Sequence, residues 1–166
     1  GAIMIDTGFN FGGANGARLR EKVMRINEQL SGSRFLRGVN AIGGTTKDIS
    51  KENQGKLMEE LQYIIKDFSE VISIAENSSS LLNRLKDTGI LTNQIAKDYG
   101  VVGVAAKAIG IEMDARADYP YAVYDKLEFK SAVGQGGDVY ARFSVRVKEV
   151  YSSFEIIKKA LSRLYE

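Results

Sequence analysis

Apolar residues recur every three or four positions over long stretches of this chain, which is the spacing of one face of an α-helix. From Arg18, one apolar stripe predicts a helix that ends at Ser31-Gly32. A broader stripe predicts a helix over residues 51–76, with Ser50 as its N-cap. The clearest stripe follows Asp138, the expected N-cap of the last helix. Its spacing is typical of the seam of a helical bundle, and its members are Phe143, Val147, Val150, Phe154, Ile157, Leu161 and Leu164.

Shorter elements are expected between these long helices. Residues 77–80 are suited to cap a short helix, and Thr92 is suited to cap another near 93–99. Residues 100–110 are small and apolar, which suits close packing against another element. Glycine-rich stretches predict loops or turns at residues 7–16 and 134–137, and an irregular crossing with a short strand at 33–49.

Residues 111–135 have the weakest helical pattern, and we expect extended pieces at 122–124 and 127–129. The predicted fold is therefore mainly α: a helical bundle of three or four long helices with an irregular, partly extended segment at about 111–135. We expect one domain over residues 1–166. Because the chain starts without Met in an apolar segment, we interpret it as a piece of a longer protein.

Composition removes several function classes. The formal net charge is +2, with 23 basic and 21 acidic residues, so we expect no nucleic-acid partner. No apolar run approaches the roughly 18 residues of a transmembrane helix. The chain contains no His and no Cys, the commonest metal ligands and nucleophiles, so we expect no metal site in it.

The densest group of functional side chains lies at residues 114–124, around Pro120, the only proline. It contains two carboxylates, one arginine and three tyrosines. One interpretation is a polar site that handles protons or binds an anion. The other is an ion pair that fastens a long loop to the helices, because arginine offers a planar fork that matches a carboxylate. Chemistry alone favours the ion pair, since structural networks also perturb pKa values.

These residues also resemble a known family. Asp114-Ala-Arg116, Pro120-Tyr121 and Tyr124 resemble a stretch of the large subunit of energy-conserving, membrane-bound nickel–iron hydrogenases of the Ech and formate-hydrogenlyase type. The quinone-site subunit of respiratory complex I carries a similar stretch. Further runs resemble the family in its order: Asp6-Thr-Gly8, Arg18-Leu-Arg20-Glu21 with Leu30–Arg34 and Gly43-Gly44, Asn83-Arg84 with Thr88-Gly89 and Tyr99–Gly103, and Gly137–Arg142 with Arg146 and Glu149. The chain departs from the family's common pattern at Val104 and at Lys107, where proline and arginine are usual.

The resemblance implies roles for individual residues. The candidates for a proton path or the inner cavity are Asp6, Glu21, Arg34, Asp114 and Arg116. The residues assigned to structure or to a subunit interface are Pro120, Tyr121, Tyr124, Asp138, Arg142, Arg146 and Glu149.

The resemblance implies a central domain of a hydrogenase-type oxidoreductase large subunit, on the cytoplasmic, peripheral side of a membrane-bound complex. Its partners would be a small iron–sulfur subunit and membrane subunits. The two Cys-x-x-Cys pairs that hold nickel and iron are absent, so the metal centre would belong to the intact parent and the isolated chain would be inactive. The alternative is a fragment of a complex I-type NADH:quinone oxidoreductase subunit. A second alternative is a helical interaction domain without enzymatic function.

Overall fold

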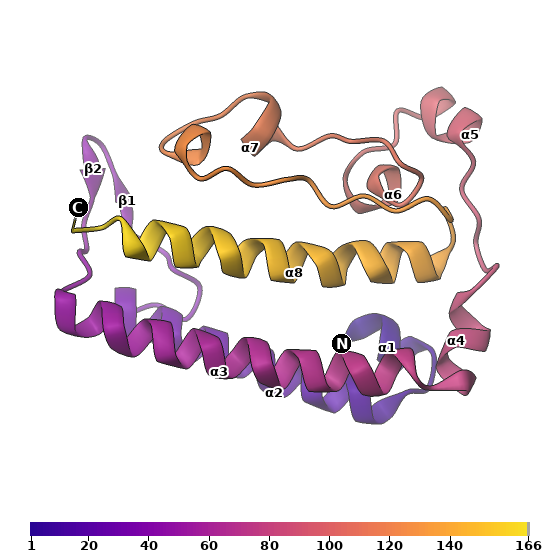
Figure 1. Cartoon of the computed structure of the whole chain (residues 1–166), viewed down its shortest axis with the longest axis horizontal. Coiled ribbons are helices and arrows are strands. Elements are labelled where there is room, and N and C mark those ends of the chain that lie inside the picture. Colours follow the sequence, from indigo (N-terminus) through magenta and orange to yellow (C-terminus); the bar gives the residue numbers. More distant parts are fainter. Residues whose placement is uncertain (166) are drawn as a thin grey trace. The chain divides into compact units, whose positions relative to one another are not determined.

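A computed structural model describes residues 1–165, and the fold is mainly α, as predicted (Figure 1). Three helices are long, and the remaining elements are short. In chain order they are α1 (Ala2–Asp6), α2 (Asn10–Ser31), β1 (Asn40–Ala41), β2 (Gly44–Thr45), α3 (Lys51–Glu76), α4 (Ser79–Leu85), α5 (Asn93–Asp98), α6 (Gly103–Lys107), α7 (Ala115–Asp118), the 3-10 helix η1 (Tyr124–Lys126) and α8 (Val139–Ser162).

The described chain divides into two compact units. The first comprises residues 1–74 together with Tyr165, and the second comprises residues 75–164. The first unit thus holds α1, α2, the β-strands and nearly all of α3. The expectation of one domain over residues 1–166 stays a prediction.

The first unit corrects the loop predicted at residues 7–16, because α2 already begins at Asn10. The glycines are there for close packing. A Cβ atom on Gly12 would overlap the sulfur of Met4, and one on Gly13 would overlap the side chain of Ile5. Helix α1 therefore lies directly on the first turns of α2, and this close approach overrides the low helix propensity of glycine.

Two of the predicted helix ends are confirmed in this unit. Helix α2 ends at Gly32, whose φ of 77° lies in the left-handed region that glycine adopts without strain. At the start of α3, the backbone N–H of Asn53 donates to Ser50 Oγ over 3.2 Å. The segment between the two helices contains the antiparallel β1–β2 hairpin, with Asn40 opposite Thr45. Ile42, at the turn of this hairpin, is fully exposed.

Ion pairs join α2 to α3. Asp67 of α3 accepts hydrogen bonds from both terminal nitrogens of Arg18, at 2.6 and 2.7 Å, and from Lys22 Nζ at 3.0 Å. The Lys22 ammonium also lies 4.1 Å from the ring centre of Tyr63. These contacts connect residues that are 41 to 49 positions apart in sequence.

In the second unit, α6 packs against α8 through small side chains. The buried core cluster contains Ala108, Ala141 and Val145, with Val104 packed against it. The segment before α8 runs beside α6. Its backbone N–H groups donate to carbonyl groups at the end of α6. Gly134 N–H donates to the carbonyl of Lys107, and Gly137 N–H donates to that of Ala108. This close packing explains the small apolar residues from 104 to 109. Val102, before α6, is instead exposed.

Several hydrogen bonds converge at the start of α8. Asp138 caps the helix by accepting from the N–H of Ala141 at 2.7 Å, and it also accepts from the N–H of Asp87 at 2.9 Å. Arg142 donates to the carbonyls of Gly137 and Gly89, both at 2.8 Å. We call this set of contacts the α8 anchor. It holds the backbone after α4 against the first turn of α8.

The extended pieces predicted at residues 122–124 and 127–129 are wrong. Residues 124–126 form η1, and neither range contains a strand. The backbone turns at Ala122 and Glu128, whose φ angles of 52° and 44° lie in the left-handed region. The irregular character predicted for 111–135 otherwise agrees with the structure, in which α7 and η1 are single turns.

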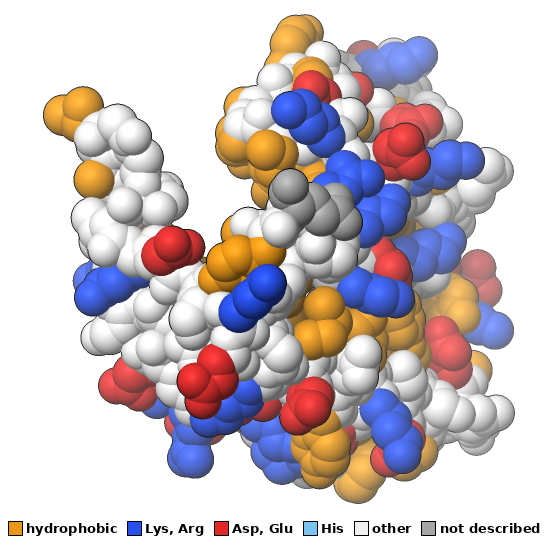
Figure 2. Space-filling model, turned by 60° about the vertical axis from the view of Figure 1, so that its left-hand side comes forward, with side chains coloured by type: hydrophobic (Ala, Val, Ile, Leu, Met, Phe, Trp, Pro, Cys, Tyr) orange, Lys and Arg blue, Asp and Glu red, His pale blue; other side chains and the backbone are white. Residues whose placement is uncertain are grey.

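Two further observations concern the crossing of a membrane and the distribution of charge on the surface. None of the helices within residues 1–165 combines the length and the hydropathy needed to cross a bilayer. On the face shown in Figure 2, basic and acidic side chains alternate and hydrophobic side chains lie between them.

Candidate functional site

The strongest concentration of buried charge lies in the second unit, around Lys107. This lysine ends α6, and its Nζ donates to Asp114 Oδ2 at 3.0 Å and to Glu149 Oε1 at 2.9 Å. Lys107 and Asp114 are only 6% and 8% exposed. Glu149 comes from the middle of α8, so the lysine connects α6, the segment before α7, and α8.

Arg116 adds a second cation to this cluster. Its Nε and Nη2 donate to the two oxygens of Asp114 at 3.0 and 2.9 Å, the fork geometry that suits a carboxylate. The guanidinium also lies 4.9 Å from the ring centre of Phe129 and 5.9 Å from that of Tyr124. We call Lys107, Asp114, Arg116 and Glu149 the charge cluster.

Local folding places Asp114 in this position. Asp114 is the N-cap of α7 and accepts a hydrogen bond from the backbone N–H of Arg116 at 3.2 Å. Its own N–H donates to Asp118 Oδ2 at 2.9 Å. The four-residue helix is thus closed at its start by two carboxylates, which fixes the direction of the Asp114 side chain.

Electrostatics keep Asp114, Lys107 and Arg116 ionised. The hydrogen bonds from Arg116 and then Lys107 hold the pKa of Asp114 well below its ordinary value, although burial opposes this shift. Burial alone would lower the pKa of Lys107, but its bonds to Glu149 and Asp114 outweigh burial and raise it. Because neither group titrates near neutral pH, the arrangement favours an ion-pair role over proton transfer at Asp114.

Tyr124 lies beside Arg116 of this cluster, and Tyr121 lies beside Tyr124. The rings of Tyr121 and Tyr124 meet edge to face with centres 5.0 Å apart, and Tyr124 meets Phe129 in the same way at 5.9 Å. Tyr121 is exposed, and Pro120 precedes it in the loop after α7. Tyr124 therefore links the arginine of the cluster to an aromatic group that reaches the surface.

The other proton-path candidates belong to the first unit. Arg34 donates to both oxygens of Glu21, at 3.2 and 2.5 Å, and Arg25 donates to it at 3.0 Å. These arginines lower the pKa of Glu21 to about 2. Asp6 is exposed at the end of α1. The first unit thus contains Asp6, Glu21 and Arg34, whereas the charge cluster belongs to the second unit.

The residues assigned to structure or interfaces fall into two groups. Asp138 and Arg142 form the α8 anchor, and the exposed Arg146 donates to the carbonyl of Arg142 at 3.2 Å. Glu149 instead belongs to the charge cluster. Lys107 was missed as a site residue, and one signal could have found it. It is the only charged residue in the small apolar stretch 100–110, which predicts a buried charge in need of a partner.

The described residues offer no metal site. Within residues 1–165, no group of three or more carboxylates gathers at one place, and the sequence lacks His and Cys altogether. The chemistry that the charge cluster can perform is therefore that of fixed charges and hydrogen bonds.

Comparisons with known proteins identify the family. Residues 6–166 match the model of the respiratory-chain NADH dehydrogenase 49-kDa subunit. An NADH-quinone oxidoreductase subunit of Clostridium beijerinckii is 37% identical over 149 residues, which cover 90% of this chain and 40% of that protein. The corresponding NADH-quinone oxidoreductase subunit of Roseiflexus sp. is 35% identical with the same coverage.

A solved structure agrees with these matches. A chain of the membrane-bound sulfane sulfur reductase, an archaeal respiratory membrane complex, aligns with a TM-score of 0.83 and 26% identity, covering 96% of this chain and 45% of that one. The present chain spans about two fifths of the length of the curated relatives that it matches. It belongs to the family of the respiratory-chain NADH dehydrogenase 49-kDa subunit.

Proposed function

We propose that this chain is part of the 49-kDa-type subunit of a membrane-associated oxidoreductase complex that transfers electrons from NADH to a quinone. The observation that carries the proposal is the match of residues 6–166 to that subunit family. Relatives named as subunits of NADH-quinone oxidoreductase, 35% and 37% identical, support it further. These comparisons favour the complex I-type alternative over the hydrogenase interpretation that the sequence motifs suggested.

In this function the charge cluster holds segments of the backbone in position and takes no part in the reaction itself. Lys107 and Arg116 hold Asp114 and Glu149 in place, so α6, the irregular segment 111–135 and α8 keep one arrangement. A subunit that lines a reaction cavity needs such rigid support, because small displacements of a site are costly. The cluster would serve that purpose without exchanging protons.

Among the candidates for proton transfer, Asp6 suits that role better than Glu21 or Asp114. Glu21 and Asp114 are held ionised by arginine and lysine partners. Asp6 is exposed and has no ion-pair partner among residues 1–165. Its carboxylate is therefore accessible to a water or to a group of a neighbouring segment.

A hydrogenase-type parent is the second candidate, favoured by the order of the five motifs described above. Nickel and iron would need thiolate ligands, and the sequence has no cysteine, so the residues present do not fit that centre and no step is assigned to it. In either case the proposed partners are a small iron–sulfur subunit and membrane subunits. We place the chain on the cytoplasmic face of the membrane.

The two candidates are distinguished by activity of the native complex. An affinity tag on the gene product that contains this chain would allow the complex to be purified from membranes of its host. We expect NADH-dependent reduction of decylubiquinone and no hydrogen-dependent reduction of methyl viologen. Hydrogen-dependent viologen reduction would instead support the hydrogenase branch. Recovery of the tagged product without iron–sulfur subunits would reject both candidates.

A further inference from the structure

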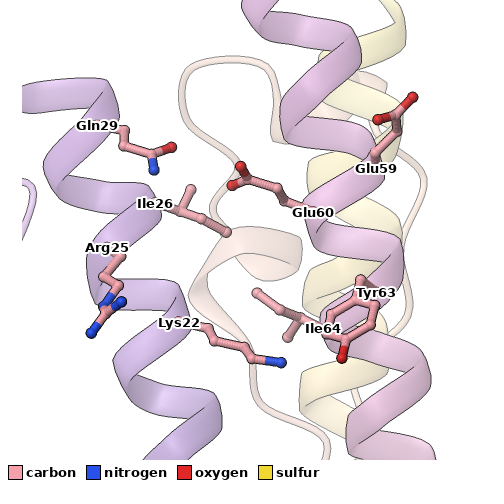
Figure 3. Close-up of a pocket in the computed structure, with 8 residues that line it drawn as sticks. All are labelled: Lys22, Arg25, Ile26, Gln29, Glu59, Glu60, Tyr63 and Ile64. Atoms are coloured by element: carbon pink, nitrogen blue, oxygen red, sulfur yellow. The ribbon is translucent and has the colours of Figure 1, made fainter.

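A groove between α2 and α3 has no role in the function proposed above. It lies wholly within the first unit, and its cavity volume is about 410 Å³. Lys22 and Ile26 of α2 and Glu60 and Ile64 of α3 point into the gap between the two helices (Figure 3). The two isoleucines give the groove an apolar lining, while Arg25 and Glu59 point away from the gap and stand at its edges.

The groove continues along the two helices. A second hollow of about 140 Å³ shares Ile26, Gln29 and Glu60 with the first and extends to Leu30 and Leu57. Lys22 and Leu30 are eight residues apart on α2, a length of about 12 Å or two turns of helix. The two hollows together therefore form a groove that is two helical turns long.

The charged residues of the two walls differ in pairing. The α2 wall carries Lys22 and Arg25, which pair with Asp67 and Glu21. The α3 wall carries Glu59 and Glu60 beside the first hollow and Lys56 beside the second, and none of these three has an ion-pair partner within the described chain. Two unpaired carboxylates against one unpaired ammonium leave the α3 wall with a net negative charge, which favours a cation in whatever occupies the groove.

The two walls also restrict the backbone conformation of a chain that binds in the groove. Both are helices, whose N–H and C=O groups are hydrogen-bonded internally, so they offer no edge to which a strand could add. A chain that enters an apolar groove of this kind must satisfy its own backbone, and a helix does so. An amphipathic helix also matches the length of the groove and the parallel course of its walls.

We propose that the α2–α3 groove binds an amphipathic helix of a partner polypeptide. The helix places apolar side chains, spaced three and four residues apart, over Ile26, Leu30 and Ile64. Basic side chains along one edge of the helix face Glu59 and Glu60. This inference rests on the groove alone, so it stands or falls independently of the redox function.

Two labelled peptides test the charge assignment by fluorescence anisotropy with the purified 166-residue chain. Both are helical, about 18 residues long, with leucines at helical spacing. One carries lysines along a single edge of the leucine stripe, and the other carries glutamates there. Two exposed ion pairs predict that the lysine-edged peptide binds about fivefold more tightly.

The double substitution Glu59→Lys with Glu60→Lys should invert this preference, because the wall becomes basic. The matched control is Glu52→Lys with Glu70→Lys, which makes the same charge change on α3 outside the groove and should leave the preference unchanged. The proposal is overturned if neither peptide binds at about 1 mM. It is equally overturned if Glu59→Lys with Glu60→Lys does not alter the preference.

The substitution Gln29→Trp tests the place of binding. Gln29 is exposed on the groove wall, so the indole can fill the groove without entering the core, and we expect both peptides to bind about tenfold more weakly. Circular dichroism verifies that the variant is folded. Sedimentation equilibrium covers another occupant, a second copy of the chain. Self-association that Gln29→Trp abolishes would overturn the proposal in favour of a dimer.

Discussion

At the scale of single residues, the second unit depends on one lysine. Lys107 is 6% exposed and neutralises carboxylates that lie seven and forty-two residues away in sequence. Breaking a buried pair by removing one partner is costly, since the remaining charges stay desolvated. The arrangement therefore makes the charge cluster more sensitive to the loss of Lys107 than to that of any exposed cation.

We predict that Lys107→Met lowers the free energy of unfolding by about 2–3 kcal/mol, which is below the usual range of about 3–5 kcal/mol for a broken buried pair because Arg116 still neutralises Asp114. Urea denaturation followed by circular dichroism measures the change. The control is Lys158→Met on α8, whose side chain is 51% exposed and pairs with Glu155 over 3.8 Å. It should shift stability by less than about 0.5 kcal/mol. Equal midpoints for the two variants would contradict the prediction.

Asp67 predicts how the first unit responds to acid. Its bonds from Arg18, and then from Lys22, lower its pKa from 3.8 to about 2. A lowered folded-state pKa means that the carboxylate stabilises the fold above about pH 4, and that this stabilisation is lost as pH falls towards 2.

Asp67→Asn should therefore be less stable than the parent chain at neutral pH, by up to about 1 kcal/mol. The difference should shrink below pH 4 and vanish near pH 2, the window between the two pKa values. Unfolding free energies measured across this range test the prediction, with Glu70→Gln on the exposed face of α3 as control. A difference that is independent of pH would show that the aspartate acts by packing alone.

At the scale of elements, the ends of helices are set by specific atoms. Gly137 precedes the N-cap of α8 with a φ of 67°, and its carbonyl accepts from the N–H of Leu91 and from Arg142. A Cβ atom there would overlap the carbonyl of Leu91 and lie 2.9 Å from the Cγ2 of Ile109. Both the backbone angle and the space therefore require glycine.

Gly137→Ala should destabilise the chain by about 2–3 kcal/mol, because alanine is strained at this φ and its methyl group displaces the α8 anchor. Gly55→Ala is the matched control, since Gly55 lies inside α3 with no atom within 4 Å of an added Cβ. That substitution should instead stabilise by about 0.5–1 kcal/mol. Thermal unfolding of both variants measures these changes in stability. An unchanged stability of Gly137→Ala would mean that the α8 anchor does not depend on this glycine.

Sequence patterns were sufficient for elements whose signals are local. The stripe and the cap of α3 or of α8 lie within one stretch of chain, so Ser50 and Asp138 were predictable. The early start of α2 was not, because its glycines are explained only by contact with α1. In the charge cluster, Asp114 and Arg116 are neighbours and were found together. Lys107 was missed because its contact with Glu149 depends on the packing of α6 against α8.

At the scale of the whole molecule, protection from solvent is uneven. Nearly every residue from 35 to 48 is exposed, and the β1–β2 hairpin has only two residues in each strand. An isolated two-stranded hairpin is marginal in water. Val145, by contrast, is fully buried in the middle of α8.

Amide hydrogen exchange should follow this contrast. We expect residues 35–48 to exchange within seconds and the amides around Val145 to exchange only through large-scale opening. Exchange of the folded chain, followed by proteolysis and mass spectrometry of the fragments, gives both rates in one experiment. Slow exchange throughout the hairpin would mean that it is protected by contacts that its exposure does not reveal, such as self-association.

The α8 anchor has a consequence for variation in chain length. It brings residues 87–91 and 137–142 together, so everything between them is a loop closed at its base. The entropy of closing a loop rises slowly, by about 0.6 kcal/mol for each doubling of its length. Insertions in the irregular stretch within this loop should therefore be inexpensive, while α4 and α8 stay joined. We therefore expect the fold to tolerate a short insertion beside the exposed Tyr121.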